Sequence, residues 1–185
     1  MDQRGLVERA REGDHDAFTI LVDLTVARLD AAARLILRDP ELARDAVQEA
    51  LITAWRRMRG LRDPDRFDAW LYRLLVNASL DLARRRRRRV YEVELQPTDE
   101  PAVPDEAGAF ADRALLDEAL ASLPPGHRAV VVLHYYLGMP LPEVAQSIGI
   151  PLGTAKSRLH YALAAMRTTV TAERAATPFA EGQPA

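Results

Sequence analysis

The sequence contains no cysteine, so disulfide bonds and thiolate metal sites are excluded. It has no apolar run near the roughly 20 residues that span a bilayer. Its first residues, MDQRGLVERAREGD, lack the apolar segment of a secretory signal. Strand patterns are also nearly absent, so we predict an all-α fold and expect no membrane insertion.

Charge is distributed unevenly along the chain, although the net charge is only −2. Residues 56–89 carry 12 basic and 4 acidic side chains, including six consecutive arginines, whereas residues 90–120 carry 1 basic and 9 acidic side chains. The stretch VELQPTDEPAVPDEAG has three prolines and few large apolar groups. It cannot bury enough surface to offset its ordering entropy, so we predict a linker.

Helical periodicity on both sides of this linker predicts two small helical domains. Before it, apolar residues recur at helical spacing from Asp16 to Ile36, from Glu41 to Arg59, and from Asp63 into the arginine run. Asp39-Pro40 and Asp63-Pro64 are typical helix starts. We therefore predict an N-terminal domain over 1–90, an acidic linker over 91–109, a second domain over 110–168 and a disordered tail over 169–185.

The second domain contains a helix-turn-helix pattern, LPEVAQSIGIPLGTAKSRLHYALAAMR. Gly149 supplies the tight turn, and the small Ala145 lets two helices cross closely. The second helix presents small polar groups between two cations, which suits the major groove of DNA, because the small groups approach base edges and the cations reach phosphates. The predicted contacts are Thr154, Lys156, Ser157, Arg158 and Tyr161.

The helix over 41–59 has an unusual outer face, on which Ile52 lies among acidic and amide groups. From the pattern alone, a solvated surface with one exposed isoleucine is favoured over a docking face for a basic partner. The face comprises Asp45, Gln48, Glu49, Ile52 and Arg56.

Cations beside aromatic rings in residues 55–88 suggest binding of single-stranded DNA, in which backbone attraction and base stacking act together. Phe67 and Trp70 are assigned to the core instead. The arginine run is consistent with broad contact to DNA phosphates. The alternatives are a solvated helix end, a nuclear-localisation signal or a polybasic patch that binds a membrane. The candidate contacts are Trp55, Arg57, Arg59, Arg62, Arg66, Tyr72, Arg73, Asn77, Arg84, Arg85 and Arg88.

Three motifs in this order resemble the extracytoplasmic-function (ECF) sigma factors of bacterial RNA polymerase. DAVQEALITAWRR and FDAWLYRLLVNASLDLARRRRRR are similar to the second conserved region of that family. LPPGHRAVVVLHYYLGMPLPEVAQSIGIPLGTAKSRLHYALAAMR is similar to the fourth. The resemblance covers residues 14–90 and 110–168. It implies a cytoplasmic bacterial protein that directs transcription initiation without catalysis of its own and without a cofactor.

The resemblance also implies partners and roles. The clamp helices of the largest polymerase subunit would bind the face formed by Asp45, Gln48, Glu49 and Ile52. The resemblance therefore favours a docking face over a solvated surface. The second domain would meet the flap of the second subunit. The arginine-rich loop and the stripe with Tyr72, Arg73 and Asn77 would hold the melted −10 element of promoter DNA. The helix-turn-helix would recognise the −35 element, and an anti-sigma factor is an expected partner.

Two other classes of function compete with this interpretation. A helix-turn-helix regulator would bind duplex operator without polymerase, but no heptad seam or ligand domain supports it. A nucleic-acid enzyme would need Asp45 with Glu49, or Asp63 with Asp65, to hold Mg²⁺, and these spacings are as common in solvated helices. His127 and His134 lack further zinc ligands. We therefore expect no catalytic residues and no metal site.

Overall fold

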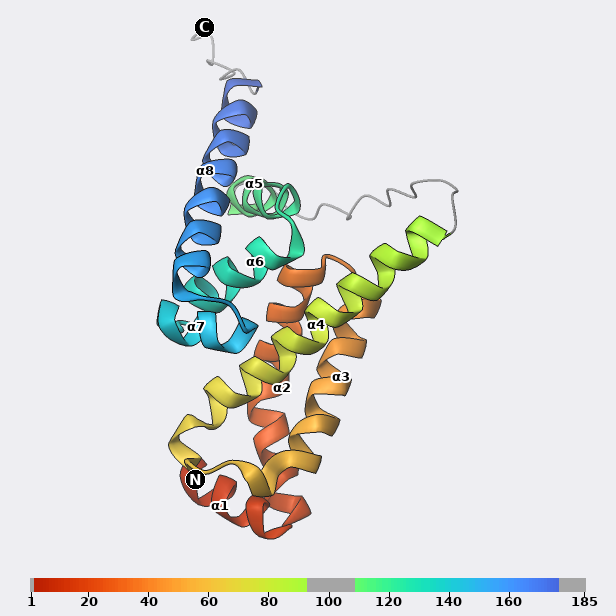
Figure 1. Ribbon diagram of the computed structural model, residues 1–185, viewed down its shortest axis with the longest axis vertical. Coiled ribbons are helices and arrows are strands. Elements are labelled where there is room, and N and C mark those ends of the chain that lie inside the picture. The colour runs from red at the N-terminus through yellow and green to blue at the C-terminus, as the bar shows by residue number, and fades with distance from the viewer. Residues whose placement is uncertain (1, 93–108, 177–185) are drawn as a thin grey trace, which may run out of the picture.

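The computed structural model describes residues 2–92 and 109–176, with side chains described for residues 2–88 and 114–173. The regular structure of these segments is entirely helical, which confirms the predicted fold class (Figure 1). Short turns are η1 (Met58–Gly60), η2 (Pro64–Arg66) and the π-helical η3 (Val132–Tyr136). The α-helices are α1 (Gln3–Glu12), α2 (His15–Leu37), α3 (Pro40–Arg57), α4 (Phe67–Glu92), α5 (Ala109–Ala121), α6 (Pro125–Val131), α7 (Leu141–Ile148) and α8 (Leu152–Ala176).

The boundaries of the linker and tail differ from those predicted. Residues 91–92 belong to α4 and residue 109 to α5, while most of the linker, 93–108, lies outside the described residues. The predicted tail begins inside α8, which continues to Ala176 because alanine, glutamate and arginine near its end favour a helix. The hydroxyl groups of Thr168 and Thr171 bond to carbonyls one turn earlier in this extension.

Aspartate side chains fix the starts of the N-terminal helices. The Asp39 carboxylate accepts hydrogen bonds from the backbone N–H groups of Glu41 and Leu42 at 2.9 and 3.0 Å. Pro40 occupies the first helical position. This confirms the predicted start of α3. Asp63 caps η2 in the same way, and that turn runs directly into α4.

Replacing the α3 cap gives a first test of these local rules. We expect Asp39→Ala to lower the free energy of unfolding by about 1 kcal/mol, because two helix N–H groups lose their acceptor. The same carboxylate also meets Arg86 of α4, so Asp39→Asn is the matched control that keeps the cap and removes the charge. Urea denaturation followed by circular dichroism measures both, and equal stability of Asp39→Ala and wild type would contradict the capping role.

Helix α1 was not predicted. It is short, but Leu6, Val7 and Ala10 bury one face of it. On its exposed side, Arg4 forms an ion pair with Asp65 of η2 at 2.8 Å, and the Gln3 amide donates to the Asp68 carboxylate at the start of α4 at 2.8 Å. Helix α1 therefore supports the loop that connects α3 to α4.

The predicted apolar stripes of α2, α3 and α4 meet in one core. Leu51, Trp70 and Leu74 pack at its edge rather than inside it. The buried members are Leu21, Leu29, Ala32 and Ile36 of α2, Ala43, Ala46, Val47, Ala50 and Ala54 of α3, and Phe67, Leu71, Leu75 and Ala78 of α4.

The C-terminal helices pack against the N-terminal core as well as against one another. Val130, Leu133, Leu137 and Val144 belong to the same apolar cluster as α2 and α4. A smaller cluster joins α5, α6 and α8 through Leu120, Leu123, Val131 and Ala162. Figure 1 shows α6 and α7 lying between α8 and the long helix α4. The sequence does not predict this contact between the halves, and the domain division stays a prediction.

Candidate nucleic-acid interface

The loop between α3 and α4 combines exposed arginines with buried apolar side chains that hold its backbone in place. Met58 is 1% exposed and Leu61 is 6% exposed, so the backbone is held at both points. The side chains of Arg59, Arg62 and Arg66 are exposed between and beyond these anchors. This arrangement gives the predicted phosphate-binding loop a fixed base and exposed cations.

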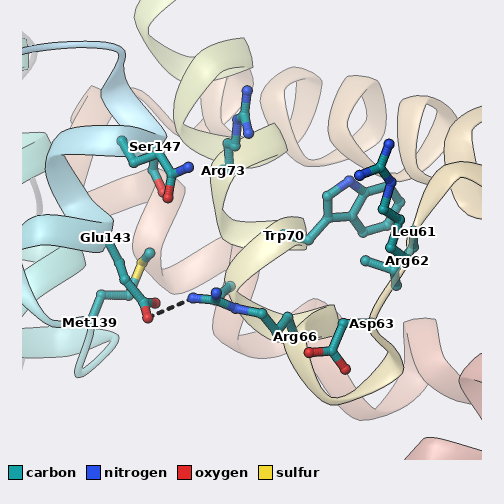
Figure 2. Close-up of a pocket in the computed structure, with 11 residues that line it drawn as sticks. Leu61, Arg62, Asp63, Arg66, Trp70, Arg73, Met139, Glu143 and Ser147 are labelled. Atoms are coloured by element: carbon teal, nitrogen blue, oxygen red, sulfur yellow. Dashed lines mark hydrogen bonds and ion pairs between the residues drawn. The ribbon is translucent and has the colours of Figure 1, made fainter.

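A cavity of about 240 Å³ lies between this loop and α7 (Figure 2). Arg62, Arg66, Trp70 and Arg73 line it from the N-terminal side. From the other side, the Glu143 carboxylate accepts a hydrogen bond from the Arg66 guanidinium at 2.7 Å. Met139, Gln146 and Ser147 complete the C-terminal wall. The structure thus brings together three of the predicted −10 contacts and adds α7 groups that the sequence interpretation missed.

Along α4, Arg73 and Asn77 are exposed one turn apart, and Arg84, Arg85 and Arg88 continue the basic surface. Tyr72 was predicted to contact DNA, but its side chain is only 5% exposed. The guanidinium of Arg28 lies 5.6 Å from the centre of its ring, and burial raises the pKa of its phenol. In this arrangement the Tyr72 ring is closed to a DNA base.

Trp55 is half-buried at the opposite end of α3 from the cap. Its ring centre lies 4.0 Å from that of His15 and 5.0 Å from that of Phe18. The indole is therefore engaged with α2 and shows only part of its surface. Arg57, next along the chain, is exposed.

Helices α7 and α8 form the predicted helix-turn-helix. Gly149 ends α7 in the left-handed region at φ 73°, a conformation that favours glycine. Ala145 and Ala155 are buried where the two helices cross. On the outer side of α8, Tyr161 is 65% exposed. Lys156 and Ser157 are exposed with it, and Thr154 is half-buried.

Arg158 departs from the predicted outer face. It is half-buried, and its Nη1 lies 3.3 Å from the position that a Cβ at Gly126 would take. It lines a cavity of about 500 Å³ between α4, α6 and α8, together with Arg84, Arg87 and His127. Burial lowers the pKa of His127, and the charge of Arg158 lowers it further.

Arg128, in the middle of α6, is a buried cation that does not line this cavity. It is 7% exposed, and its Nε atom has no hydrogen-bond partner. Burial lowers its pKa to about 10, with a further contribution from the nearby charge of Arg38. The cationic residues that line the cavity are Arg84, Arg87 and Arg158, a group whose charge an anionic polymer would neutralise.

The predicted docking face lies on α3, away from both cavities. Asp45, Gln48 and Glu49 are exposed, and Ile52 is 43% exposed. A groove of about 410 Å³ between α2 and α3 is lined by Gln48 and Ile52 together with Val26, Ala27, Asp30, Arg44, Val47 and Leu51. Acidic and apolar groups on one face, beside a groove, suit a basic partner with an apolar side chain.

The described residues contain neither a group of metal ligands nor a membrane-spanning helix. Over residues 2–88 and 114–173, no three His, Cys, Asp or Glu side chains are grouped so as to hold a metal ion. None of the helices in the same segments combines the length and the apolar content of a membrane span.

Comparison with known proteins identifies both halves. A family model described as Sigma-70 region 2 matches residues 21–89, and one described as Sigma-70, region 4 matches residues 113–166. The ECF RNA polymerase sigma factor SigL of Mycobacterium tuberculosis is 39% identical over 153 residues, which are 81% of this chain and 86% of that protein.

Two solved structures are also similar. CnrH, in complex with the cytosolic domain of CnrY, has a TM-score of 0.65 at 30% identity, and the match covers 92% of this chain and 97% of CnrH. RpoE of Bartonella quintana, in complex with the anti-sigma factor NepR, has a TM-score of 0.71. That match covers 83% of this chain and 96% of RpoE at 24% identity, and shows likeness of fold.

Proposed function

Because the chain belongs to the ECF sigma factors of bacterial RNA polymerase, we propose that its three exposed surfaces divide promoter recognition between them. The α3 face docks on core polymerase, the loop before α4 holds the melted −10 element, and α8 recognises the −35 element. The observation that carries this proposal is that one chain presents both an anchored arginine loop and a helix-turn-helix. A regulator that binds only duplex DNA needs the helix-turn-helix but not the arginine loop.

The −10 surface consists of Arg59, Arg62, Arg66, Arg73 and Asn77. The arginines hold the backbone of the displaced strand, and the amide of Asn77 offers a donor and an acceptor to a base. A base drawn out of the stack enters the space beside Trp70, in the same way that enzymes extract a base from a duplex.

The −35 surface is the exposed face of α8. Lys156 reaches a phosphate or a guanine edge, and Ser157 approaches bases because its side chain is short. The Ser157 hydroxyl donates to the carbonyl of Gly153 at 2.8 Å, which leaves its oxygen lone pairs for a base donor. Tyr161 adds an exposed ring one turn later.

The partners follow from these surfaces. We expect the polymerase clamp helices to meet α3, the flap to meet the C-terminal helices, and promoter DNA to bridge both. An anti-sigma factor is a further expected partner, since the similar RpoE was solved with one. We expect the protein to work in the bacterial cytoplasm and to leave all catalysis to the polymerase.

Run-off transcription tests the proposal directly. Purified chain is combined with core polymerase and a library of randomised promoter templates, and the transcribed templates are sequenced. We expect enrichment of two separated elements, with the upstream preference lost in Lys156→Ala and the downstream preference weakened in Arg73→Gln. A duplex footprint without polymerase, accompanied by no transcription from any template, would support the regulator instead.

A further inference from the structure

A basic cavity of about 500 Å³ lies where the second half of α4 faces the start of α6 and the first turns of α8. Arg84 and Arg87 line it one helical turn apart on α4, Arg158 lines it from α8, and His127 lines it from α6. Among the residues that the structure describes, this lining contains three arginines and no carboxylate. Positive charge is therefore concentrated in a concave site that three helices build.

The protein leaves most of this charge without a counterion. Within residues 2–88 and 114–173, neither Arg87 nor Arg158 forms an ion pair. Arg84 meets Asp81 at 3.2 Å, but both side chains are largely exposed, and such a pair contributes little. Because Arg158 is half-buried, the lack of a carboxylate beside it costs free energy. An anion bound in the cavity would remove that cost.

Gly126 makes room for the Arg158 guanidinium. A Cβ at this position would lie 3.3 Å from Nη1 of Arg158, so a side chain here would press on the guanidinium. The neighbouring His127 has a lowered pKa, because of burial first and the charge of Arg158 second. Its imidazole is thus neutral near neutral pH, and it offers a hydrogen bond to a ligand instead of a further charge.

The rest of the cavity wall is apolar. Leu80 and Ala83 line it on α4, Ile148 and Ile150 line it on either side of the turn after α7, and residues 124–125 are prolines. Small-molecule sites combine apolar walls with a few convergent polar groups, in volumes of roughly 300–1,000 Å³. Arginine is the side chain best suited to phosphate, because its planar fork can donate two parallel hydrogen bonds.

We propose that this cavity binds a small polyphosphate, with its phosphates between the α4 arginines and Arg158 and any attached base or sugar against the apolar wall. A DNA backbone fits the site less well, because DNA phosphates are bound by exposed cations on a surface and would leave the apolar wall unused. The proposal is independent of how the chain divides promoter recognition, and its failure would leave those three surfaces as they are.

Calorimetric titration of the full chain with inorganic triphosphate and with ATP, in about 0.15 M salt to screen surface attraction, is the first test. We expect one site, and we expect Arg87→Glu to weaken binding about ten-fold or more, because an attraction becomes a repulsion. Arg87 is exposed, so this variant should melt close to wild type. Tighter binding of ATP than of triphosphate would assign the apolar wall to the base, and equal binding would assign the site to the phosphates alone.

The matched control is Arg85→Glu, which makes the same change in charge at an exposed residue of α4 outside the cavity lining. We expect it to weaken binding by about two-fold at most, through general attraction alone. Equal losses in the two variants would mean an adventitious attraction of anions to the arginine run only, and would overturn the proposal.

The His127 imidazole reports where the ligand binds. In proton–carbon NMR spectra, with the His127 signal assigned from His127→Gln, saturating triphosphate should shift this signal and raise the pKa of His127, because a nearby negative charge favours the imidazolium. His160, which is exposed on α8 and does not line the cavity, should not respond. An unchanged His127 signal would place the ligand elsewhere. Binding of mixed-sequence duplex DNA that is weakened by Arg87→Glu, with no response of the wild-type chain to triphosphate, would assign these cations to DNA and overturn the proposal.

Discussion

Reversing the charge of the α3 face should nearly abolish transcription by the reconstituted holoenzyme. In Asp45→Arg/Glu49→Arg, two exposed carboxylates become cations on the face proposed to meet a basic partner. Loss of two attractions and gain of two repulsions at an interface should reduce run-off transcription about 100-fold or more. The groove lined by Gln48 and Ile52 stays intact, so its apolar contact alone would have to hold the complex.

The matched control is Glu12→Arg/Asp23→Arg, which makes the same change in net charge at exposed positions on α1 and α2. Both double variants should melt at temperatures close to wild type, because none of the four side chains is buried. Transcription by the α3 variant at the level of this control would remove the docking assignment. Unchanged binding of the α3 variant to single-stranded DNA would place its defect in polymerase docking.

The local elements of the fold were predictable because their signals are local. Asp39-Pro40 supplies both a capping carboxylate and a residue fixed near helical φ, and the structure places α3 there. Gly149 marks the turn of the helix-turn-helix for a similar reason, since its left-handed φ disfavours other residues. Such signals need no knowledge of the rest of the chain.

The errors lie where distant segments meet. Tyr72 and Val76 flank the predicted stripe of α4, yet they are 5% and 0% exposed. Helix α4 buries a wider surface than one stripe because α7 and α6 join α2 and α3 in packing on it. The placement of Arg158 beside Gly126 depends on a different contact, that of α8 with α6 inside the C-terminal half. A periodic pattern shows which face of a helix is apolar. It does not show which polar residues beside that face become buried when another segment packs there.

Truncating Phe67 should cause the largest loss of stability in the N-terminal helices. Its side chain is 2% exposed at the first residue of α4, with its ring centre 6.2 Å from that of Trp70. Phe67→Ala leaves a cavity that the surrounding helices can fill only in part, so we expect a loss of about 3–5 kcal/mol. Single domains are stable by only about 5–15 kcal/mol, so this half of the chain would become marginal.

The two tryptophans, Trp55 and Trp70, both lie in the N-terminal helices, so fluorescence during urea denaturation reports on that half. Phe67→Leu is the matched control, because it keeps an apolar group of moderate volume and should cost less than half as much as Phe67→Ala. If the two variants were equally stable, Phe67 would not occupy the core position described here. Met58 and Phe67 anchor the arginine loop at its two ends, so Phe67→Ala should also lower transcription by more than its unfolded fraction explains.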